Sequence, residues 1–280
     1  MNVSHNIRTI NFNSLKIGGE TSFPILRPAY VLNIPIYNCN DNFEISKQYF
    51  QTVNRVELVK KAQLSDCDIL SLQFNIGDIH EIQDAVNILN GIIPYVTKPL
   101  MISGTGKDDI DKKLLPELIK NVNCEVILNS INENTYKEII PFVVSGNHVA
   151  VLKTPIDINL AKELNILSAD LGLSLDKILI DTDIGGLGYG LEYGYSIMEK
   201  IKLEGLKGDE YLNMPIISFA CAEALKTKEA KTDIINDSLG TLQERANYFE
   251  LAAASAVIAC GANVIVMNSP SNISVMKGLV

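Results

Sequence analysis

The feature that most constrains the fold of this chain is a regular alternation of short apolar runs with longer segments of helical spacing. Eight short runs, rich in β-branched and other apolar residues, recur along the sequence at Tyr30–Ile36, Asp68–Phe74, Pro99–Ser103, Glu125–Asn129, His148–Leu152, Lys177–Asp181, Met214–Phe219 and Asn263–Met267. Runs of this kind between helical segments are typical of buried parallel strands. Eight strand and helix pairs predict an α/β protein, a (β/α)8 TIM barrel, which needs about 250 residues. A doubly wound open sheet is the alternative topology.

The segment from Asp157 to Gly172, DINLAKELNILSADLG, shows the helical spacing most clearly. Its leucines recur at intervals of three and four residues, at Leu160, Leu164, Leu167 and Leu171. Asp157 is suited to cap the start of a helix, and Gly172 is suited to end it. The pattern predicts an outer helix that covers the sheet with its leucine face.

Length and composition point to one domain. A chain of 280 residues with 47% hydrophobic residues can bury one large core. We expect a single barrel domain over residues 1–280. Residues 1–28 are expected to be an N-terminal extension that folds as a hairpin or plugs the barrel floor.

Charge and cysteine content exclude several classes of function. The formal net charge is -9, so we expect no binding to nucleic acid or to a membrane surface. The sequence has an odd number of cysteines, and no two of them form a C-x-x-C pair. The five are Cys39, Cys67, Cys124, Cys221 and Cys260. This usage predicts reduced thiols and no local zinc or iron-sulfur site.

Two features of the chain predict a cytoplasmic location. The start, MNVSHNIRTINFNSL, lacks the basic residues and continuous apolar core of a signal peptide. The longest uncharged run, Leu251–Met267, is interrupted by CGAN and divides into a helix end and a strand.

In a barrel, function belongs to the loops that follow the carboxyl ends of the strands. After the third to sixth predicted strands these loops read SGTGKDD, NSINENT, LKTPIDIN and DTDIGGLGYG. Their amides and hydroxyls suit a polar, mostly neutral ligand. The residues predicted to line this mouth are Thr105, Asn129, Asp181, Thr182, Gly186, Gly188, Tyr189 and Gly190.

Two of the loops match nucleotide-binding motifs only in part. Gly104–Lys107 lacks the first glycine of a phosphate-binding loop, and Asp108 stands where that motif has Ser or Thr. A plain turn is therefore favoured there. Gly186–Gly190 has the spacing G-x-G-x-G rather than G-x-G-x-x-G, so dinucleotide binding is disfavoured. A tight turn and a close approach of the backbone to a ligand or partner both stay open for this loop.

Single residues at the strand ends carry further alternatives. Lys153 could form a Schiff base if burial lowered its pKa, although a surface lysine is favoured. Asp181 and Asp183 suit acid, base or metal-ligand chemistry, or hydrogen bonding within the loop. His148 begins a strand and is expected near the barrel floor, away from any chemistry.

Three stretches of the chain carry a resemblance to a known family. They are DINLAKELNILSADLGL, GGLGYGLEYGYSIMEKIKLEGLKGDEYLNMPII and ERANYFELAAASAVIACGANVIVMNSP, with KIGGE at Lys16–Glu20 as an early addition. The chain resembles the small (delta) subunit of the corrinoid iron-sulfur protein of the acetyl-CoA decarbonylase/synthase pathway. The resemblance covers most of the sequence.

The resemblance implies a barrel related to pterin-binding methyltransferases that works as a carrier subunit. It implies a large (gamma) partner subunit that holds the iron-sulfur cluster and a base-off corrinoid (cobalamin), which the barrel mouth caps. The methyl group would pass from a pterin methyltransferase to acetyl-CoA synthase. The mouth residues given above would then face the corrinoid, and none is assigned a catalytic role.

Two rival functions stay open, and one segment of the chain matches the family only weakly. The barrel could be a methyltransferase that binds the pterin itself, with Asn129 and Asp181 as hydrogen-bonding partners of the ring. A Schiff-base lyase that uses Lys153 is the second rival. The segment Phe219–Leu242 matches the family weakly, so the resemblance implies little about contacts after the seventh strand.

Overall fold

A closed parallel barrel forms the centre of the protein. The computed structural model describes residues 7–19, 26–37, 54–184, 190–233 and 237–279. Its barrel strands lie in the order β10-β3-β4-β5-β6-β7-β8-β9, and every neighbouring pair is parallel. The strands are β3 (Ala29–Tyr37), β4 (Ile69–Phe74), β5 (Leu100–Ser103), β6 (Val126–Ile131), β7 (Val149–Lys153), β8 (Ile178–Asp181), β9 (Ile216–Ser218) and β10 (Val264–Met267). All eight predicted strands are confirmed, and the closed barrel excludes the open sheet.

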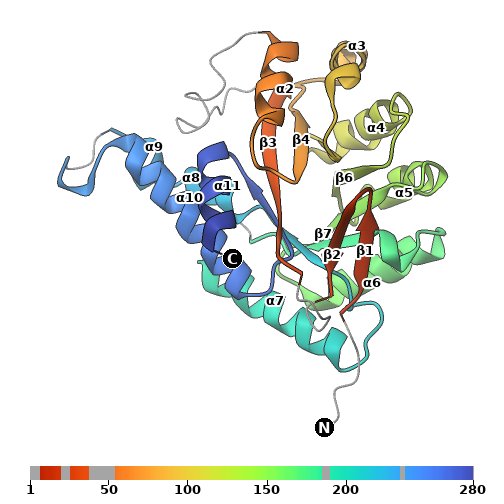
Figure 1. Ribbon diagram of the computed structural model, residues 1–280. Helices are drawn as coiled ribbons and strands as arrows, with labels where there is room; N and C mark the ends of the chain where they lie inside the picture. The colour runs from red at the N-terminus through yellow and green to blue at the C-terminus, as the bar shows by residue number, and fades with distance from the viewer. Residues whose placement is uncertain (1–6, 20–25, 38–53, 185–189, 234–236, 280) are drawn as a thin grey trace.

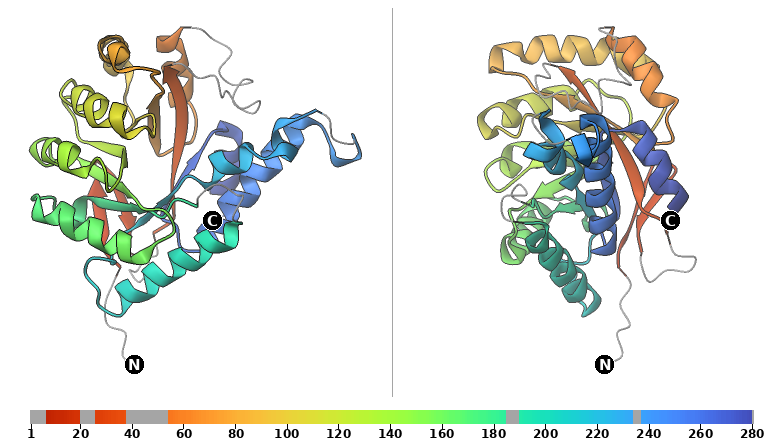
Figure 2. Two further views of the ribbon diagram at one scale, coloured as in Figure 1. Left: turned by 180° about the vertical axis from the view of Figure 1, so that it is seen from behind. Right: turned by 90° about the vertical axis from the view of Figure 1, so that its left-hand side faces the viewer.

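Helices surround the barrel, as Figures 1 and 2 show. They are α2 (Arg55–Gln63), α3 (Ile82–Ile92), α4 (Asp108–Ile119), α5 (Tyr136–Ser145), α6 (Ile158–Asp170), α7 (Leu191–Leu206), α8 (Ala220–Leu225), α9 (Lys228–Lys231), α10 (Leu242–Ala259) and α11 (Pro270–Leu279). The largest buried cluster lies between these helices and the outer face of the strands. None of the helices described has the length and apolar character that crossing a bilayer requires.

The ends of helix α6 agree with the sequence, but its buried face differs from the prediction. The Asp157 side chain accepts hydrogen bonds from two backbone amides of the first turn, and Gly172 has a φ of +93° after the last turn. The buried residues are Ala161, Leu164, Asn165 and Ser168, whereas Leu171 is 39% exposed. Asn165 faces inward because its Nδ2 donates to the carbonyl of Tyr211, 2.7 Å away.

An antiparallel hairpin fills the barrel at the end where the strands begin. It consists of β1 (Thr9–Phe12) and β2 (Leu15–Gly18), and Figure 1 shows it in dark red. Its apolar side chains, Ile10, Phe12 and Ile17, form one buried cluster with inward residues near the starts of the strands, such as Val31 and Ile69. This end of the barrel is therefore a packed apolar core.

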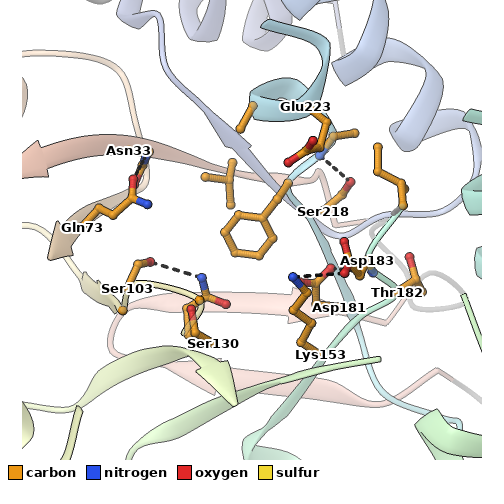
Figure 3. Close-up of a pocket in the computed structure, with 18 of the residues that line it drawn as sticks. Asn33, Gln73, Ser103, Ser130, Lys153, Asp181, Thr182, Asp183, Ser218 and Glu223 are labelled. Carbon is orange, nitrogen blue, oxygen red and sulfur yellow. Dashed lines mark hydrogen bonds and ion pairs between the residues drawn. The ribbon is translucent and has the colours of Figure 1, made fainter. Parts of the chain in front are cut away.

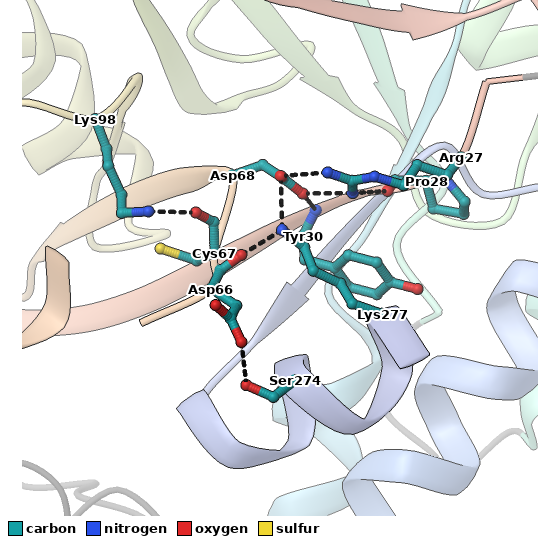
Figure 4. Close-up of polar contacts among 9 residues, drawn as sticks. All are labelled: Arg27, Pro28, Tyr30, Asp66, Cys67, Asp68, Lys98, Ser274 and Lys277. Atoms are coloured by element: carbon teal, nitrogen blue, oxygen red, sulfur yellow. Dashed lines mark hydrogen bonds and ion pairs between the residues drawn. The ribbon is translucent and has the colours of Figure 1, made fainter. Parts of the chain in front are cut away.

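A buried carboxylate ties the segment before β3 and the last helix to the barrel wall (Figure 4). Asp68 lies directly before β4 and accepts hydrogen bonds from both terminal nitrogens of Arg27, at 2.9 and 2.7 Å. It also accepts from the Tyr30 amide at 2.9 Å and from Lys277 of α11 at 2.8 Å. We call these four residues the Asp68 cluster. It joins the starts of β3 and β4 to helix α11.

The connection after β9 contains extra helical turns that reach away from the barrel (Figures 1 and 2). Helices α8 and α9 precede α10, and Arg245 of α10 is only 6% exposed. Its guanidinium donates to the carbonyls of Glu229, Thr232 and Gly240. One side chain therefore holds several turns of this connection, which we call the α8–α10 arm.

Replacing Arg245 with Met should loosen the α8–α10 arm and leave the barrel strands unchanged. The variant leaves backbone carbonyls without their charged donor, and each such bond contributes about 1.5–3 kcal/mol. We expect faster amide exchange over residues 228–233 in hydrogen-exchange mass spectrometry. The exposed Lys231→Met should exchange like the parent protein. Equal acceleration in the strands would show that Arg245 supports the whole fold instead.

Candidate functional site

A cavity of about 230 Å³ opens at the carboxyl end of the barrel strands (Figure 3). The inward positions of several strands change from apolar to polar as they approach it. On β5 the change is from Met101 to Ser103, on β6 from Ile127 to Asn129, and on β8 from Leu179 to Asp181, each pair two residues apart. Because alternate residues of a strand share one face, this change places the polar side chains on the cavity wall.

One half of the cavity wall is neutral and hydrogen-bonded. Asn33 Nδ2 donates to Gln73 Oε1 at 3.0 Å, and Ser71 Oγ donates to Asn33 Oδ1 at 3.0 Å. Ser71 and Ser103 share a hydrogen bond at 3.2 Å, and Asn129 Nδ2 donates to Ser103 Oγ at 3.3 Å. These contacts form one chain of amides and hydroxyls from β3 to β6.

The other half of the wall is charged (Figure 3). Lys153 at the end of β7 pairs with Asp183 at 3.0 Å, and Glu223 of α8 pairs with Lys226 at 2.7 Å. Asp181 lies next to the first pair and is 5% exposed. The cavity therefore presents amides and hydroxyls on one side and ionisable groups on the other.

Burial governs the protonation of Asp181. Desolvation raises its pKa to about 7, although the Lys153 ammonium and the Asp183 backbone amide act in the opposite direction. For Lys153, burial lowers the pKa, but the carboxylates of Asp181 and Asp183 outweigh it, and the pKa is raised overall. Lys153 is thus a protonated, paired ammonium, which disfavours a Schiff-base role.

Two buried polar atoms on this wall have no hydrogen-bond partner among the described residues. They are Asn129 Oδ1 and Thr182 Oγ1, from residues that are 8% and 1% exposed. Buried polar groups are normally paired, so unpaired ones in a cavity point to a ligand. Backbone strain occurs beside both: Ser130 and Asp183 have φ values of 78° and 36°, which non-glycine residues seldom adopt.

The predicted mouth residues divide into three groups. Thr105, Asn129, Asp181 and Thr182 all line the cavity. Gly190 caps the start of α7 with a φ of 86° and is not among the described residues on the cavity wall. Gly186, Gly188 and Tyr189 lie outside the described residues.

The loop Gly104–Lys107 encloses a carboxylate of its own chain. Asp111 accepts from the Thr105 amide and hydroxyl at 2.8 and 2.9 Å and from the Gly106 amide at 2.8 Å. These amides are already occupied, so they are not available to a phosphate. This agrees with the plain turn favoured from the sequence.

Other single-residue predictions had mixed outcomes. Lys153 is partly a surface lysine, as favoured from the sequence, because its side chain is 41% exposed, but it also lines the cavity, since it shares the inward face of β7 with Val149 and Val151. His148 is buried at the opposite end of the strands, as expected, and its Nδ1 accepts from the Val126 amide at 3.3 Å. The described residues include no group of three side chains that could hold a metal ion.

Sequence reasoning missed several residues of the cavity wall. They are Asn33, Gln73, Ser103, Ser130, Ser218, Glu223 and Lys226. A signal existed for the first three, because a polar residue interrupts the inward positions of an otherwise apolar run. Glu223 and Lys226 gave no such signal, since they lie in the arm that follows β9.

Comparison with known proteins decides the family. The model of the CO dehydrogenase/acetyl-CoA synthase delta subunit family matches residues 11–279. This chain belongs to that delta-subunit family. The match includes every strand of the barrel.

Curated relatives in the delta-subunit family share part of their length with this chain. The acetyl-CoA decarbonylase/synthase complex subunit delta of Methanopyrus kandleri is 32% identical over 197 residues, which are 70% of this chain and 48% of the relative. The subunit of the same name from Methanocaldococcus jannaschii is 28% identical over 199 residues, with the same coverage of 70% and 48%. The chain thus spans about half the length of these relatives.

Solved structures show that the delta-subunit barrel has the fold of dihydropteroate synthases. A Xanthomonas albilineans dihydropteroate synthase with 4-aminobenzoic acid has a TM-score of 0.64 and 11% identity, covering 97% of this chain and 98% of that one. A Coxiella burnetii dihydropteroate synthase in complex with pteroic acid has a TM-score of 0.61 and 14% identity, covering 98% and 97%. At these identities the likeness establishes the fold alone.

Proposed function

We propose that the chain is the small subunit of a corrinoid iron-sulfur protein and that its barrel mouth caps a corrinoid held by a larger partner subunit. The observation that carries the proposal is the match of residues 11–279 to the delta-subunit family. The bound corrinoid would carry a methyl group on cobalt, from a pterin methyltransferase to acetyl-CoA synthase in the reductive acetyl-CoA pathway. The iron-sulfur cluster would belong to the partner.

The size and polarity of the mouth support a capping role. A cavity of about 230 Å³ is smaller than the roughly 300–1,000 Å³ of pockets that enclose drug-sized ligands. A corrin macrocycle would therefore rest on the mouth, and only its side arms would enter. Those arms end in amides, for which the unpaired oxygens of Asn129 and Thr182 are suitable partners.

The chain's own residues would orient the ligand and exclude water from one face of it. Asn129 and Thr182 would accept or exchange hydrogen bonds with the amide arms. Lys153 and Asp183, held together as an ion pair, would form the charged rim. We assign no catalytic residue, and we place the protein in the cytoplasm as part of this proposal.

A second candidate is a barrel that binds the pterin itself and acts as a methyltransferase. The observation in its favour is the small cavity with buried Asn129 and Asp181 on its wall, which suits a two-ring heterocycle. Isothermal titration of the isolated chain with methyltetrahydrofolate tests it. Tight binding without a partner subunit would favour the enzyme over the carrier.

Anaerobic affinity purification of the tagged chain from its own cells tests the carrier function. We expect a larger subunit in equal amount and the absorption bands of a corrinoid and an iron-sulfur cluster. Asn129→Ala should retain the larger subunit but hold the corrinoid about fivefold more weakly, as expected for the loss of about 1 kcal/mol in one hydrogen bond.

The matched control is Asn87→Ala, on the exposed face of α3. It should retain as much corrinoid as the parent protein. If the parent protein purifies from its own cells as a colourless single chain, the carrier function is contradicted.

A further inference from the structure

A second cavity, of about 410 Å³, lies at the end of the barrel opposite the mouth. It opens between the last turns of α4 and α5, which neighbour each other in Figure 1, and the residues that lead into β6 and β7. We call it the floor cavity. Its volume falls within the roughly 300–1,000 Å³ of pockets that hold small ligands. Among the described residues it shares no lining residue with the mouth, so a ligand bound there leaves the mouth free.

One buried side chain on the wall of the floor cavity is held in a single tautomer. His148 is 5% exposed, and its Nδ1 accepts from the Val126 amide at 3.3 Å. A ring nitrogen that accepts carries no proton, so the proton of the neutral ring is on Nε2. Burial lowers the pKa of His148, while Glu125 and Lys177, which pair with each other, act on it in opposite directions. The ring is therefore neutral near pH 7, with Nε2–H as its donor.

This donor has no acceptor in the described part of the chain. The hydrogen bond from Val126 is the only one that the His148 ring forms there. Nε2 lies against Gly146, where a Cβ would collide with it, so the glycine leaves the space beside Nε2 open. Both residues line the cavity. Buried N–H groups are normally paired, so this arrangement points to an acceptor that a ligand supplies.

The charged groups at the floor cavity are already paired. Lys120 pairs with Glu117 at 2.6 Å, and its ammonium lies 4.9 Å from the centre of the Phe142 ring. Glu125 pairs with Lys177. A charged ligand would therefore have to displace one of these pairs, whereas a neutral ligand would not.

The remaining lining favours an apolar molecule and disfavours a metal ion. Ile119, Val122 and Phe142 supply apolar surface. Metal ions bind the unprotonated nitrogen of a neutral imidazole, and here that nitrogen is occupied by the Val126 amide. Burial also raises the pKa of Cys124, which lines the same cavity, so its thiol stays protonated.

We propose that the floor cavity binds a small neutral molecule with an apolar ring and a carbonyl oxygen, which accepts a hydrogen bond from His148 Nε2. The apolar side chains of α4 and α5 would pack against the ring of the ligand. The proposal does not rest on the corrinoid function, because the floor cavity and the mouth lie at opposite ends of the barrel. A ligand in the floor cavity would stay accessible while a partner covers the mouth.

Protection of Cys124 from alkylation in the full chain tests the proposal. Cys124 is exposed at the cavity, whereas Cys67, Cys221 and Cys260 are buried. The probes are 1-indanone and indane, which share one two-ring carbon skeleton and differ in the carbonyl oxygen. 1-Indanone should slow the reaction of iodoacetamide with Cys124 saturably, as measured by mass spectrometry of the peptide. Indane should need about fivefold higher concentration for the same effect, because it lacks the hydrogen bond.

Nitrogen-15 NMR of the imidazole gives a second measurement that does not depend on Cys124. Long-range correlation spectra identify the tautomer, and Nε2 of His148 should carry the proton at pH 7. The Nε2 resonance should move when 1-indanone is added and stay in place with indane.

Variants test whether the ligand occupies the floor cavity. Ser145 lines it at the end of α5, and its hydroxyl donates to the Phe142 carbonyl at 3.0 Å. Ser145→Trp should fill the cavity and abolish the effect of 1-indanone on the alkylation rate. The matched control is Ser255→Trp on α10, where the exposed serine donates to the Leu251 carbonyl at 2.8 Å. It should bind as the parent protein does. His148→Phe keeps an aromatic ring and removes the donor, so the two probes should then protect equally.

Several results would overturn the proposal. They are equal protection by the two probes in the parent protein, no protection by either probe, or unchanged protection in Ser145→Trp. A stronger effect of indane-1-carboxylate than of 1-indanone would show that the cavity takes an anion instead. A proton on Nδ1 of His148 would remove the donor from which the proposal starts. None of these results bears on the corrinoid, whose retention is measured in the affinity-purified complex.

Discussion

Replacing Asp68 with Ala should lower the free energy of unfolding by about 1.5–3 kcal/mol at pH 7, the contribution of a hydrogen bond to a charged group, because Asp68 is buried whereas the Arg27 side chain is 47% exposed and regains water. The Asp68 side chain is 8% exposed and accepts from Arg27, Lys277 and the Tyr30 amide. Without it, the Lys277 ammonium and the Tyr30 amide lose a partner at the junction of β3, β4 and α11. Urea unfolding followed by circular dichroism measures the change.

The effect of Asp68→Ala should shrink in acid. Burial acts to raise the pKa of Asp68, but its hydrogen bonds to Arg27, Lys277 and Tyr30 outweigh burial and lower it overall. A carboxylate with a lowered folded pKa stabilises the protein above its unfolded pKa, and this stability is lost as pH falls through the folded value. The exposed Asp109→Ala should leave the free energy of unfolding close to that of the parent protein. A loss below about 1 kcal/mol for Asp68→Ala, or one that is equal at pH 3, would contradict the role of the cluster.

Replacing Asp181 with Asn should have the opposite effect and raise the free energy of unfolding at pH 8 by roughly 2–4 kcal/mol. This range follows from about 1.4 kcal/mol for each unit by which folding raises the pKa. The folded pKa of Asp181 is raised to about 7, so the neutral form is the one that the fold favours. Stability from such a group is complete below the unfolded pKa, near 3.9, and is lost as pH rises through the folded value. Asparagine keeps the oxygen that accepts from the Asp183 amide at 3.0 Å and avoids the buried charge.

The difference in free energy of unfolding between Asp181→Asn and the parent protein should grow between pH 4 and pH 7 and stay constant above pH 7. Thermal unfolding over this range measures it. Both proteins should retain a shallower decline from Glu250, whose pKa burial also raises to about 7. A variant that is less stable at pH 8 would show that ionised Asp181 stabilises the fold, and a stability difference that does not depend on pH would show that the pKa of Asp181 is not raised. A stabilising substitution in the mouth would also indicate that the native residue is retained for binding.

The barrel could be predicted from the sequence because local patterns encode it. Eight apolar runs with helical segments between them match β3 to β10 within a few residues, and Asp157 caps α6 as its side chain suggests. The hairpin β1–β2 is less evident, because four-residue strands with alternating burial carry little periodic signal. The buried face of α6 was predicted wrongly from its leucines for a related reason. A helix with apolar residues on more than one face does not show in its sequence which face packs against the core.

The candidate site was predictable only where a polar residue ends a strand. Thr105, Asn129, Asp181 and Thr182 could be placed at the mouth because the carboxyl ends of all barrel strands meet at one end. Their protonation and pairing could not be predicted. Whether Lys153 points to solvent or to Asp183, and whether Asp181 is buried enough for its pKa to reach about 7, depends on neighbours from β7, β8 and α8.

The sequence by itself determined the strand count, the alternation of parallel strands with helices, the delta-subunit family and the strand ends at which polar residues collect. These depend on periodicity and order along the chain, which are local properties. The tertiary structure alone decided that the strands close into a barrel, that Asp68 joins the segment before β3 to helix α11, and that Asn129 Oδ1 is left unpaired on the cavity wall. Each of these is a contact between segments far apart in sequence, and its energy depends on burial that no single segment specifies.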